Sequence, residues 1–255
     1  LIAITGQVGT ERMHLTSHQY LDLVEMFEPI TKRSKQILRP DTVNEIVRIA
    51  FKYAESEKPG AAHIDLPCNV AGMEVTDEIS KTPIRHVSRK QELACVDSIE
   101  DAAGMIFQSE RPVILAGHAA VRNNASAAIN KFSHDLKIPV INTMMAKGIV
   151  AYDNPYSMWT VGLPQEDYQN VVLKEADLVI AIGYDLVEFA PRKWNPDGNH
   201  KIIHIDTRGS HINKLYQPDI EVIGDISDAL TRILKRCGQT KENKRFEQIK
   251  EMMEE

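Results

Sequence analysis

The residues best placed for chemistry stand where short apolar runs of the sequence end. Gln7 follows the run at residues 1–5, and His14 and His18 lie in the polar stretch after it. Apolar runs bounded by turn residues indicate buried strands, and open α/β sheets bind ligands at the carboxyl ends of their strands. Comparable positions later in the chain hold Gly117, Met145, Lys147, Gly183 and Asp185. The pattern predicts ligand-facing loops, with exposed surface histidines as the alternative for His14 and His18.

No familiar cofactor motif accompanies these loops. Gly117 and Gly183 each end an apolar run, but the second and third glycines of G-x-G-x-x-G are missing, and no G-x-x-x-x-G-K-[ST] occurs. The histidines form neither H-x-H nor H-E-x-x-H, and no C-x-x-C pair exists. These absences disfavour a dinucleotide, P-loop or zinc site, and lone glycines at strand ends are ordinarily turn residues.

Several other conspicuous residues have structural explanations. His63 and His204 lie inside apolar runs, which predicts buried structural histidines. Met144 and Met145 belong to a residue type that usually fills gaps in a core. No Ser/His/Asp triad or pair of carboxylates can be recognised from the residues alone.

The composition argues against several classes of protein. The formal net charge of −6, without a dense basic cluster, disfavours nucleic-acid binding. No apolar run approaches the roughly 18 residues of a membrane span. Cys68, Cys95 and Cys237 are widely separated and odd in number, and free thiols are typical of a reducing cytosol, so a cytoplasmic location is expected.

The first part of the chain alternates strand and helix patterns. Strands are predicted at 1–5, 34–38 and 61–67, a short helix at 18–27, and an amphipathic helix at 42–56. Residues 71–93 are polar, charged and weakly periodic, which is typical of a linker between domains.

A stricter alternation follows from about residue 94. Helices are predicted at 97–110, 124–137, 164–176, 210–216 and 225–237, and strands at 112–117, 139–144, 177–183, 201–206 and 221–224. Short strands alternating with amphipathic helices predict an α/β fold, in which helices flank a parallel sheet on both faces. The charged tail has Phe246, Ile249 and Met253 at helical spacing, which predicts a solvated helix.

Several stretches, taken in order, resemble one family. They are "LIAITGQV", "HQYLDLVEMFEPITKRS", "KPGAAHIDLPCNV", "RPVILAGHAAVRNNA", "IPVINTMMAKG", "ADLVIAIGYD" and "KIIHID". Together they resemble thiamine-diphosphate enzymes of the acetolactate synthase type. The resemblance implies the end of a flavodoxin-like pyrimidine-binding domain at 1–75, a linker at 76–93, a Rossmann-like (DHS-like) central domain at 94–237, and a tail at 238–255 leading toward a C-terminal cofactor domain.

The resemblance also implies an activity. The intact enzyme would use thiamine diphosphate and Mg²⁺ to condense two molecules of pyruvate into 2-acetolactate and CO₂. The family's activating glutamate and its Gly-Asp-Gly stretch have no counterpart here, since Gly-Asp occurs only at Gly224-Asp225 in another context. The chain alone is therefore expected to be inactive.

One difference from the family's sequence pattern indicates which branch of the family the chain resembles. The flavin-containing biosynthetic branch carries an Arg-Phe-Asp-Asp-Arg type of run where this chain has "YDLVEFAPRKWNP" at 184–196. His18-Gln19-Tyr20 stands at the family's Phe-Gln-Glu position and is similar to the catabolic pattern. The resemblance implies a catabolic, flavin-independent enzyme, so FAD is not expected.

The family's site residues can be carried over at a few positions. Gln7, His18, Gln19 and Lys32 are expected near the active site of the intact enzyme, where the Lys32 cation could steer the carboxylate of pyruvate. A solvated surface charge is the alternative for Lys32.

The family's working unit is a dimer or a dimer of dimers, so a homo-oligomer is expected. The chain alone is expected to self-associate through residues 1–75, because its first strand belongs to the type that is covered on both sides. The alternative is a monomer in which this segment packs on the central domain. Two other functions remain open: a related carboligase similar to glyoxylate carboligase, and a non-catalytic nucleotide-binding module.

Overall fold

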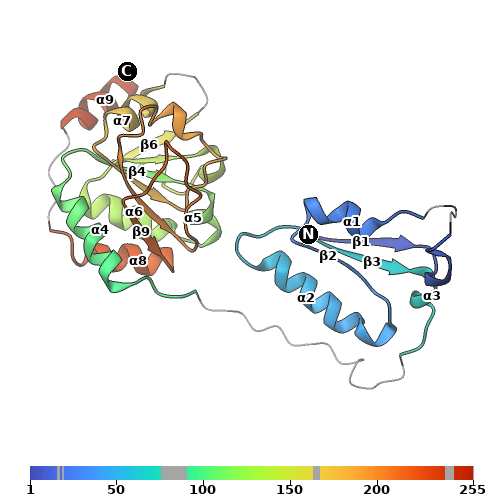
Figure 1. Cartoon of the computed structure of the whole chain (residues 1–255). Helices are drawn as coiled ribbons and strands as arrows, with labels where there is room; N and C mark the ends of the chain where they lie inside the picture. The colour runs from blue at the N-terminus through green and yellow to red at the C-terminus, as the bar shows by residue number, and fades with distance from the viewer. Residues whose placement is uncertain (16–17, 19, 76–90, 163–166, 239–243, 255) are drawn as a thin grey trace. The chain divides into compact units, whose positions relative to one another are not determined.

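The chain folds into two compact units, Leu1–Arg89 and Lys90–Glu255, each of which is described by itself. The computed structural model (Figure 1) describes residues 1–15, 18, 20–75, 91–162, 167–238 and 244–254. In these described ranges no helix is long and apolar enough to cross a membrane.

The first unit is built on a three-stranded parallel sheet in the order β1-β3-β2. Its strands are β1 (Ile2–Gln7), β2 (Arg33–Gln36) and β3 (Ala62–Pro67). Figure 1 shows α2 (Val43–Glu55) on one face of the sheet and α1 (Leu23–Phe27) on the other, and the short α3 (Cys68–Ala71) follows β3. Single 3₁₀ turns lie at Thr10–Arg12, Glu28–Ile30 and Pro40–Thr42.

The two faces of this sheet differ in chemistry. Ala62 and Ile64 pack under Ala50 and Ala54 of α2 in a small apolar core. The neighbouring positions of the strands alternate to the α1 face, where they are largely polar. Within the described residues β1 pairs only with β3, and its Ile4 side chain remains 65% exposed.

The second unit contains a six-stranded parallel sheet in the order β6-β5-β4-β7-β8-β9. Its strands are β4 (Pro112–Ala116), β5 (Val140–Asn142), β6 (Ser157–Thr160), β7 (Leu178–Ile182), β8 (Lys201–Asp206) and β9 (Ile220–Ile223). The chain adds strands on one side of β4 and then crosses back to add β7 on the other side. This reversal of strand order confirms the predicted Rossmann-like fold.

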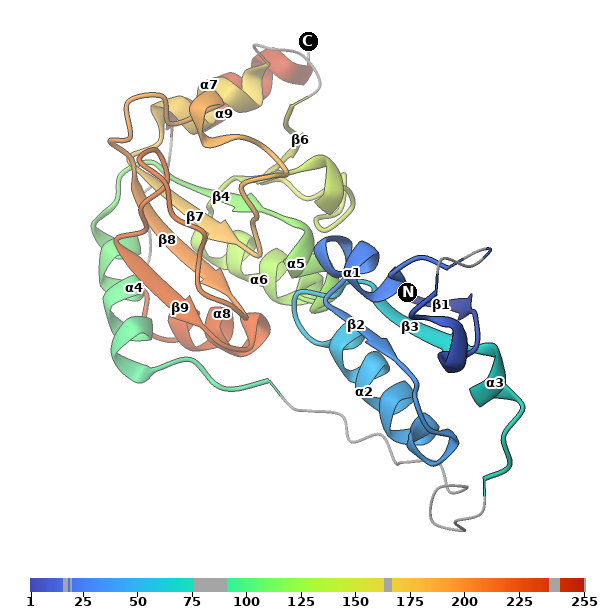
Figure 2. The same ribbon diagram turned by 45° about the vertical axis from the view of Figure 1, so that its right-hand side comes forward.

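Helices cover both faces of this sheet. Figure 2 shows α4 (Val96–Gln108) and α8 (Ile226–Leu234) on one side, and α7 (Tyr168–Glu175) and α9 (Lys244–Glu254) on the other. α5 (His118–Arg122) and α6 (Ser126–Leu136) follow β4, and 3₁₀ turns lie at Met144–Ala146 and Pro191–Lys193. Two apolar clusters result, one under each helical layer. Burial on both faces explains why these strands read as continuous apolar runs.

Two predictions about this unit were wrong, and one strand was not predicted. Residues 210–216 form no helix, because the Asn213 side chain accepts a hydrogen bond from Leu215 N (2.8 Å) and the backbone pairs Asn213 with Tyr216. The helix predicted at 124–137 begins only at Ser126, after Asn124 in a left-handed conformation. β6 was missed, since it is short and irregular, with Trp159 at a φ of 60°.

The charged tail also differs from its prediction as a solvated helix. α9 packs its Phe246 (5% exposed) and Ile249 (2% exposed) into the apolar cluster that contains Val172 and Ala176. The helical spacing of these residues was recognised in the sequence, but α7 is what they contact. The second unit therefore extends beyond the predicted boundary at residue 237.

The packing of α9 predicts a measurable loss of stability. Ile249→Ala should lower the free energy of unfolding of the second unit by about 2–4 kcal/mol, because it removes a buried side chain and leaves a cavity. Both tryptophans, Trp159 and Trp194, lie in this unit, so urea unfolding followed by tryptophan fluorescence reports on it. Glu247→Ala, on the exposed side of the same helix, is the control. Equal midpoints for the two variants would contradict the packing.

Candidate functional site

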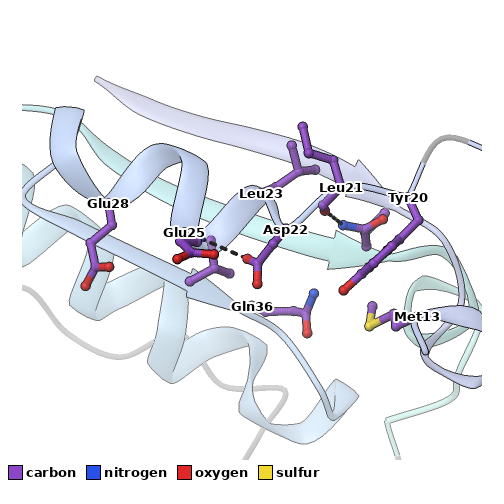
Figure 3. A pocket seen from close by; sticks show the side chains of 10 residues that line it. Met13, Tyr20, Leu21, Asp22, Leu23, Glu25, Glu28 and Gln36 are labelled. Carbon is purple, nitrogen blue, oxygen red and sulfur yellow. Dashed lines mark hydrogen bonds between the residues drawn. The ribbon is translucent and has the colours of Figure 1, made fainter. Parts of the chain in front are cut away.

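A pocket opens at the carboxyl ends of β1 and β2, on the α1 side of the first unit (Figure 3). Its volume is about 410 Å³. The strand ends contribute Gln7 and Gln36, and the loop between β1 and α1 contributes Met13 and Tyr20. The remaining polar wall is acidic, because Asp22 and Glu28 flank α1 and Glu25 lies within it.

Gln7 is held rigidly at the edge of this pocket. Its side chain is 6% exposed, its Nε2 donates to Leu21 O (2.6 Å), and its Oε1 accepts from Val8 N (3.0 Å). The amide thereby fixes the loop that enters α1 against the end of β1. Asp22 then caps α1 by accepting from Glu25 N at 2.9 Å, which explains why the helix begins at Leu23 instead of residue 18.

A row of polar side chains continues from the pocket along the sheet. Gln36 Nε2 donates to Asp65 Oδ2 (2.6 Å), and Thr5 Oγ1 donates to Asp65 Oδ1 (2.8 Å). Asp65 is fully buried, so these neutral donors replace the water that a carboxylate would otherwise require.

His63 occupies the next position of this row. Its Nε2 lies 2.8 Å from Thr5 Oγ1, its Nδ1 lies 2.8 Å from Ser34 Oγ, and its ring stacks on Phe27 with centroids 4.1 Å apart. Burial lowers the pKa of His63 below its usual value, and the charge of Asp65 opposes this shift. The prediction that His63 is buried is confirmed.

The structure does not bring together the three proposed site residues that it describes. Gln7 lines the pocket, His18 is an exposed turn residue, and Gln19 lies outside the described residues. Lys32 precedes β2, and its neighbour Arg33 is level with Ile2, five residues before Gln7 along the parallel register. At about 3.3 Å per residue, Lys32 lies at the opposite end of the sheet from the pocket.

Lys32 instead contacts the carboxyl end of α2. Its Nζ donates to Ser56 O (2.6 Å), to Ser56 Oγ (2.9 Å) and to Lys58 O (2.8 Å). A cation at this end of a helix satisfies terminal carbonyls and complements the helix dipole. The contacts support a structural role within the first unit.

The strand ends of the second unit are filled by close backbone contacts. A Cβ on Gly117 would lie 2.5 Å from Gly183 O, and a Cβ on Gly183 would lie 2.1 Å from Ala120 N. Ala119 N donates to Gly183 O (2.9 Å), which joins the start of α5 to the end of β7. Both glycines therefore allow one part of the chain to approach another closely.

The remaining proposed strand-end residues lie around this contact. Met145 is 56% exposed and Lys147 is also exposed, both after β5. Met144 is 58% exposed, so neither methionine fills a gap in the core as the sequence suggested. Asp185 follows β7, where its carbonyl accepts from Glu188 N (3.0 Å).

Glu188 is the residue that sequence reasoning missed. Its carboxylate accepts from His118 N (3.1 and 3.0 Å) and from Thr143 Oγ1 (2.5 Å). These partners follow β4 and β5, while Glu188 follows β7, so one side chain connects the loops after three adjacent strands. A lone glutamate in a loop gives no sequence signal of such a role.

The described residues do not form a site for a diphosphate and its metal ion. Asp225 of the Gly-Asp pair caps α8 by accepting from Asp228 N (2.8 Å), and a Cβ on Gly224 would lie 2.5 Å from Ala94 N. Among the residues that the structure describes, no group of three His, Cys, Asp or Glu side chains could hold a metal. No reaction step through thiamine diphosphate can therefore be assigned to these residues.

The fold of the second unit agrees with the family that the sequence matches. Residues 99–233, just over half of the chain, match the family described as thiamine pyrophosphate enzyme, central domain. The chain belongs to the thiamine pyrophosphate enzymes.

Within that family, the chain is similar to acetolactate synthases. It is 36% identical over 242 residues to a probable acetolactate synthase large subunit of Methanocaldococcus jannaschii, covering 92% of this chain and 40% of the relative. It is 32% identical over 236 residues to an acetolactate synthase of Bacillus subtilis, covering 91% and 40%. A glyoxylate carboligase of Escherichia coli O157:H7 is 30% identical over 245 residues, covering 92% and 40%. The chain thus spans about 40% of the length of these relatives.

His204 of β8 is the second predicted buried histidine, and it is 3% exposed. Its Nδ1 lies 2.9 Å from Tyr216 OH and its Nε2 lies 3.2 Å from Arg208 O. Burial lowers the pKa of His204, while the charges of Asp206, Glu221 and Asp185 and the bond to Arg208 O oppose this shift.

The lowered pKa of His204 predicts a pH dependence of stability. The folded unit binds this proton more weakly than the unfolded chain, whose histidine pKa is about 6.5. The stabilisation by neutral His204 is therefore complete above that pH and declines as the pH falls below it. Urea unfolding by tryptophan fluorescence between pH 7.5 and 5.5 should show a smaller slope for His204→Asn than for the original chain. The exposed His211→Asn is the control, and equal slopes for all three would contradict the assignment.

Proposed function

We propose that the chain is part of an acetolactate synthase that condenses two molecules of pyruvate into 2-acetolactate and CO₂. The observation that carries the proposal is the similarity to acetolactate synthases over 92% of the chain, which includes both units. Family membership implies thiamine diphosphate, whose chemistry supplies an electron sink for the decarboxylated substrate. Mg²⁺ as the partner of its diphosphate is part of the proposal.

We assign a structural role to the second unit and a role near the substrate to the first. The second unit would orient the parts of the enzyme that hold the cofactor, and the first would place Gln7, His18 and Gln19 near the substrate.

A flavin-independent enzyme is proposed from residues 184–196, which lack the Arg/Asp-rich run of flavin-containing relatives. A homo-oligomer is supported by Ile4, which is 65% exposed on β1, a strand that pairs on one side only within the described residues. The free thiols of Cys68, Cys95 and Cys237 are compatible with a cytoplasmic location.

A related carboligase is the second candidate, because a glyoxylate carboligase matches the same share of the chain at 30% identity. A non-catalytic nucleotide-binding module is less well supported, since Gly117 and Gly183 are used for contacts within the chain.

The proposal predicts where activity resides. The intact protein, supplied with thiamine diphosphate and Mg²⁺, should release CO₂ from pyruvate and give acetoin after acid treatment, with glyoxylate a poorer substrate. The 255-residue chain alone should give none, because catalysis requires the cofactor-binding groups in position. Preference for glyoxylate by the intact protein would favour the second candidate. Acetoin formation at a rate proportional to the concentration of this chain would contradict the inactivity.

Lys32 allows a sharper test in the intact enzyme. If its cation steers the carboxylate of pyruvate, Lys32→Met should raise KM for pyruvate several-fold. Lys35→Met, within β2 and also exposed, is the matched control and should leave KM unchanged. A lower Tm with unchanged KM would show that Lys32 serves only the end of α2.

A further inference from the structure

The strand order reverses between β4 and β7, the position at which sheets of this kind ordinarily form a crevice that binds nucleotide phosphates. Such sites offer backbone N–H groups and hydroxyls to an anion. Here the corresponding donors are His118 N, directly after β4, and Thr143 Oγ1, directly after β5. Both donate to the carboxylate of Glu188.

The position of Glu188 is determined by the residues on both sides of it. Glu188 N donates to Asp185 O (3.0 Å), which closes a turn directly after β7. Phe189 is 5% exposed in the apolar cluster under α7, and its carbonyl accepts a hydrogen bond from Tyr184 OH. Thr143 is fully buried, so its hydroxyl has little access to water as an alternative partner. The carboxylate is thus part of the folded structure of the unit.

A phosphate bound by these donors would compete directly with Glu188. It would have to displace the carboxylate or lie within a few ångströms of it, and like charges at that separation repel each other.

We propose that Glu188 is an internal anion that occupies the phosphate position of the crevice, and that it thereby excludes dinucleotides such as FAD from the second unit. Glu188 is then the residue that determines cofactor specificity in this unit. The inference rests on the flavin-independent part of the proposed function, but it concerns only the loops of this chain and does not depend on which 2-oxo acid the intact protein uses.

Replacing the internal anion by an added one tests the proposal. Glu188→Ala in the full chain should lower the Tm of the second unit by about 2–4 °C, because the loops after β4, β5 and β7 lose their shared acceptor. Sodium acetate, whose carboxylate can accept the same hydrogen bonds, should restore part of this loss, compared with sodium chloride at equal ionic strength. Glu247→Ala, an exposed glutamate of the same unit, should show neither effect.

Glu188→Gln provides a second variant that keeps the shape of the side chain without its charge. It should remain folded, show no rescue by acetate, and allow inorganic pyrophosphate to raise the Tm, which the original chain should not. An unchanged Tm for Glu188→Ala, a loss that acetate does not restore, or no effect of pyrophosphate on Glu188→Gln would overturn the role of Glu188.

The original chain is also titrated with FAD, and binding is measured by flavin fluorescence. This experiment separates the inference from the proposed function. Tight binding of FAD to the original chain would overturn both the role of Glu188 and flavin independence. A failure of the intact protein to produce acetolactate would leave the results for the Glu188 variants standing.

Discussion

The close approach of β4 and β7 at Gly117 and Gly183 is the constraint on which the second unit depends. With no Cβ at either position, Ala119 N reaches Gly183 O and α5 starts directly over the end of β7. This contact joins the two halves of the sheet at the point where the strand order reverses. It also brings the loops after β4, β5 and β7 close enough for one carboxylate to connect them. An alanine at either glycine would separate these loops, since backbone atoms cannot move aside as a flexible side chain can.

The first unit is organised by a different interaction. Its sheet buries a carboxylate, Asp65, and an imidazole, His63, on the face opposite α2. Buried polar groups cost free energy unless every one has a partner, and here Thr5 of β1 and Ser34 and Gln36 of β2 supply the partners. The apolar core on the other face is smaller than either apolar cluster of the second unit. The registration of the strands therefore depends on polar complementarity as well as on apolar burial.

The sequence predicted most of the fold where burial leaves a periodic pattern. β4, β7 and β8 read as continuous apolar runs because helices cover both faces, and the buried state of His63 and His204 followed from the same pattern. Prediction failed where contacts distant in the sequence decide the outcome. Tyr216 turns inward to His204 instead of continuing a helix, and Phe246 depends on α7 for its burial. Glu188 could not be recognised, because its partners lie 45 and 70 residues away.

The comparisons and the geometry together limit what this part of the protein can specify. Relatives named for acetolactate synthesis and for glyoxylate carboligation match the same share of the chain at 36% and 30% identity. Relatives named for two different activities thus resemble this chain over the same share of its residues. The buried residues of both units serve packing and strand register. Glu188 belongs to the packing residues by its contacts, yet it excludes a class of ligand, and so it shows how a structural side chain can also decide specificity.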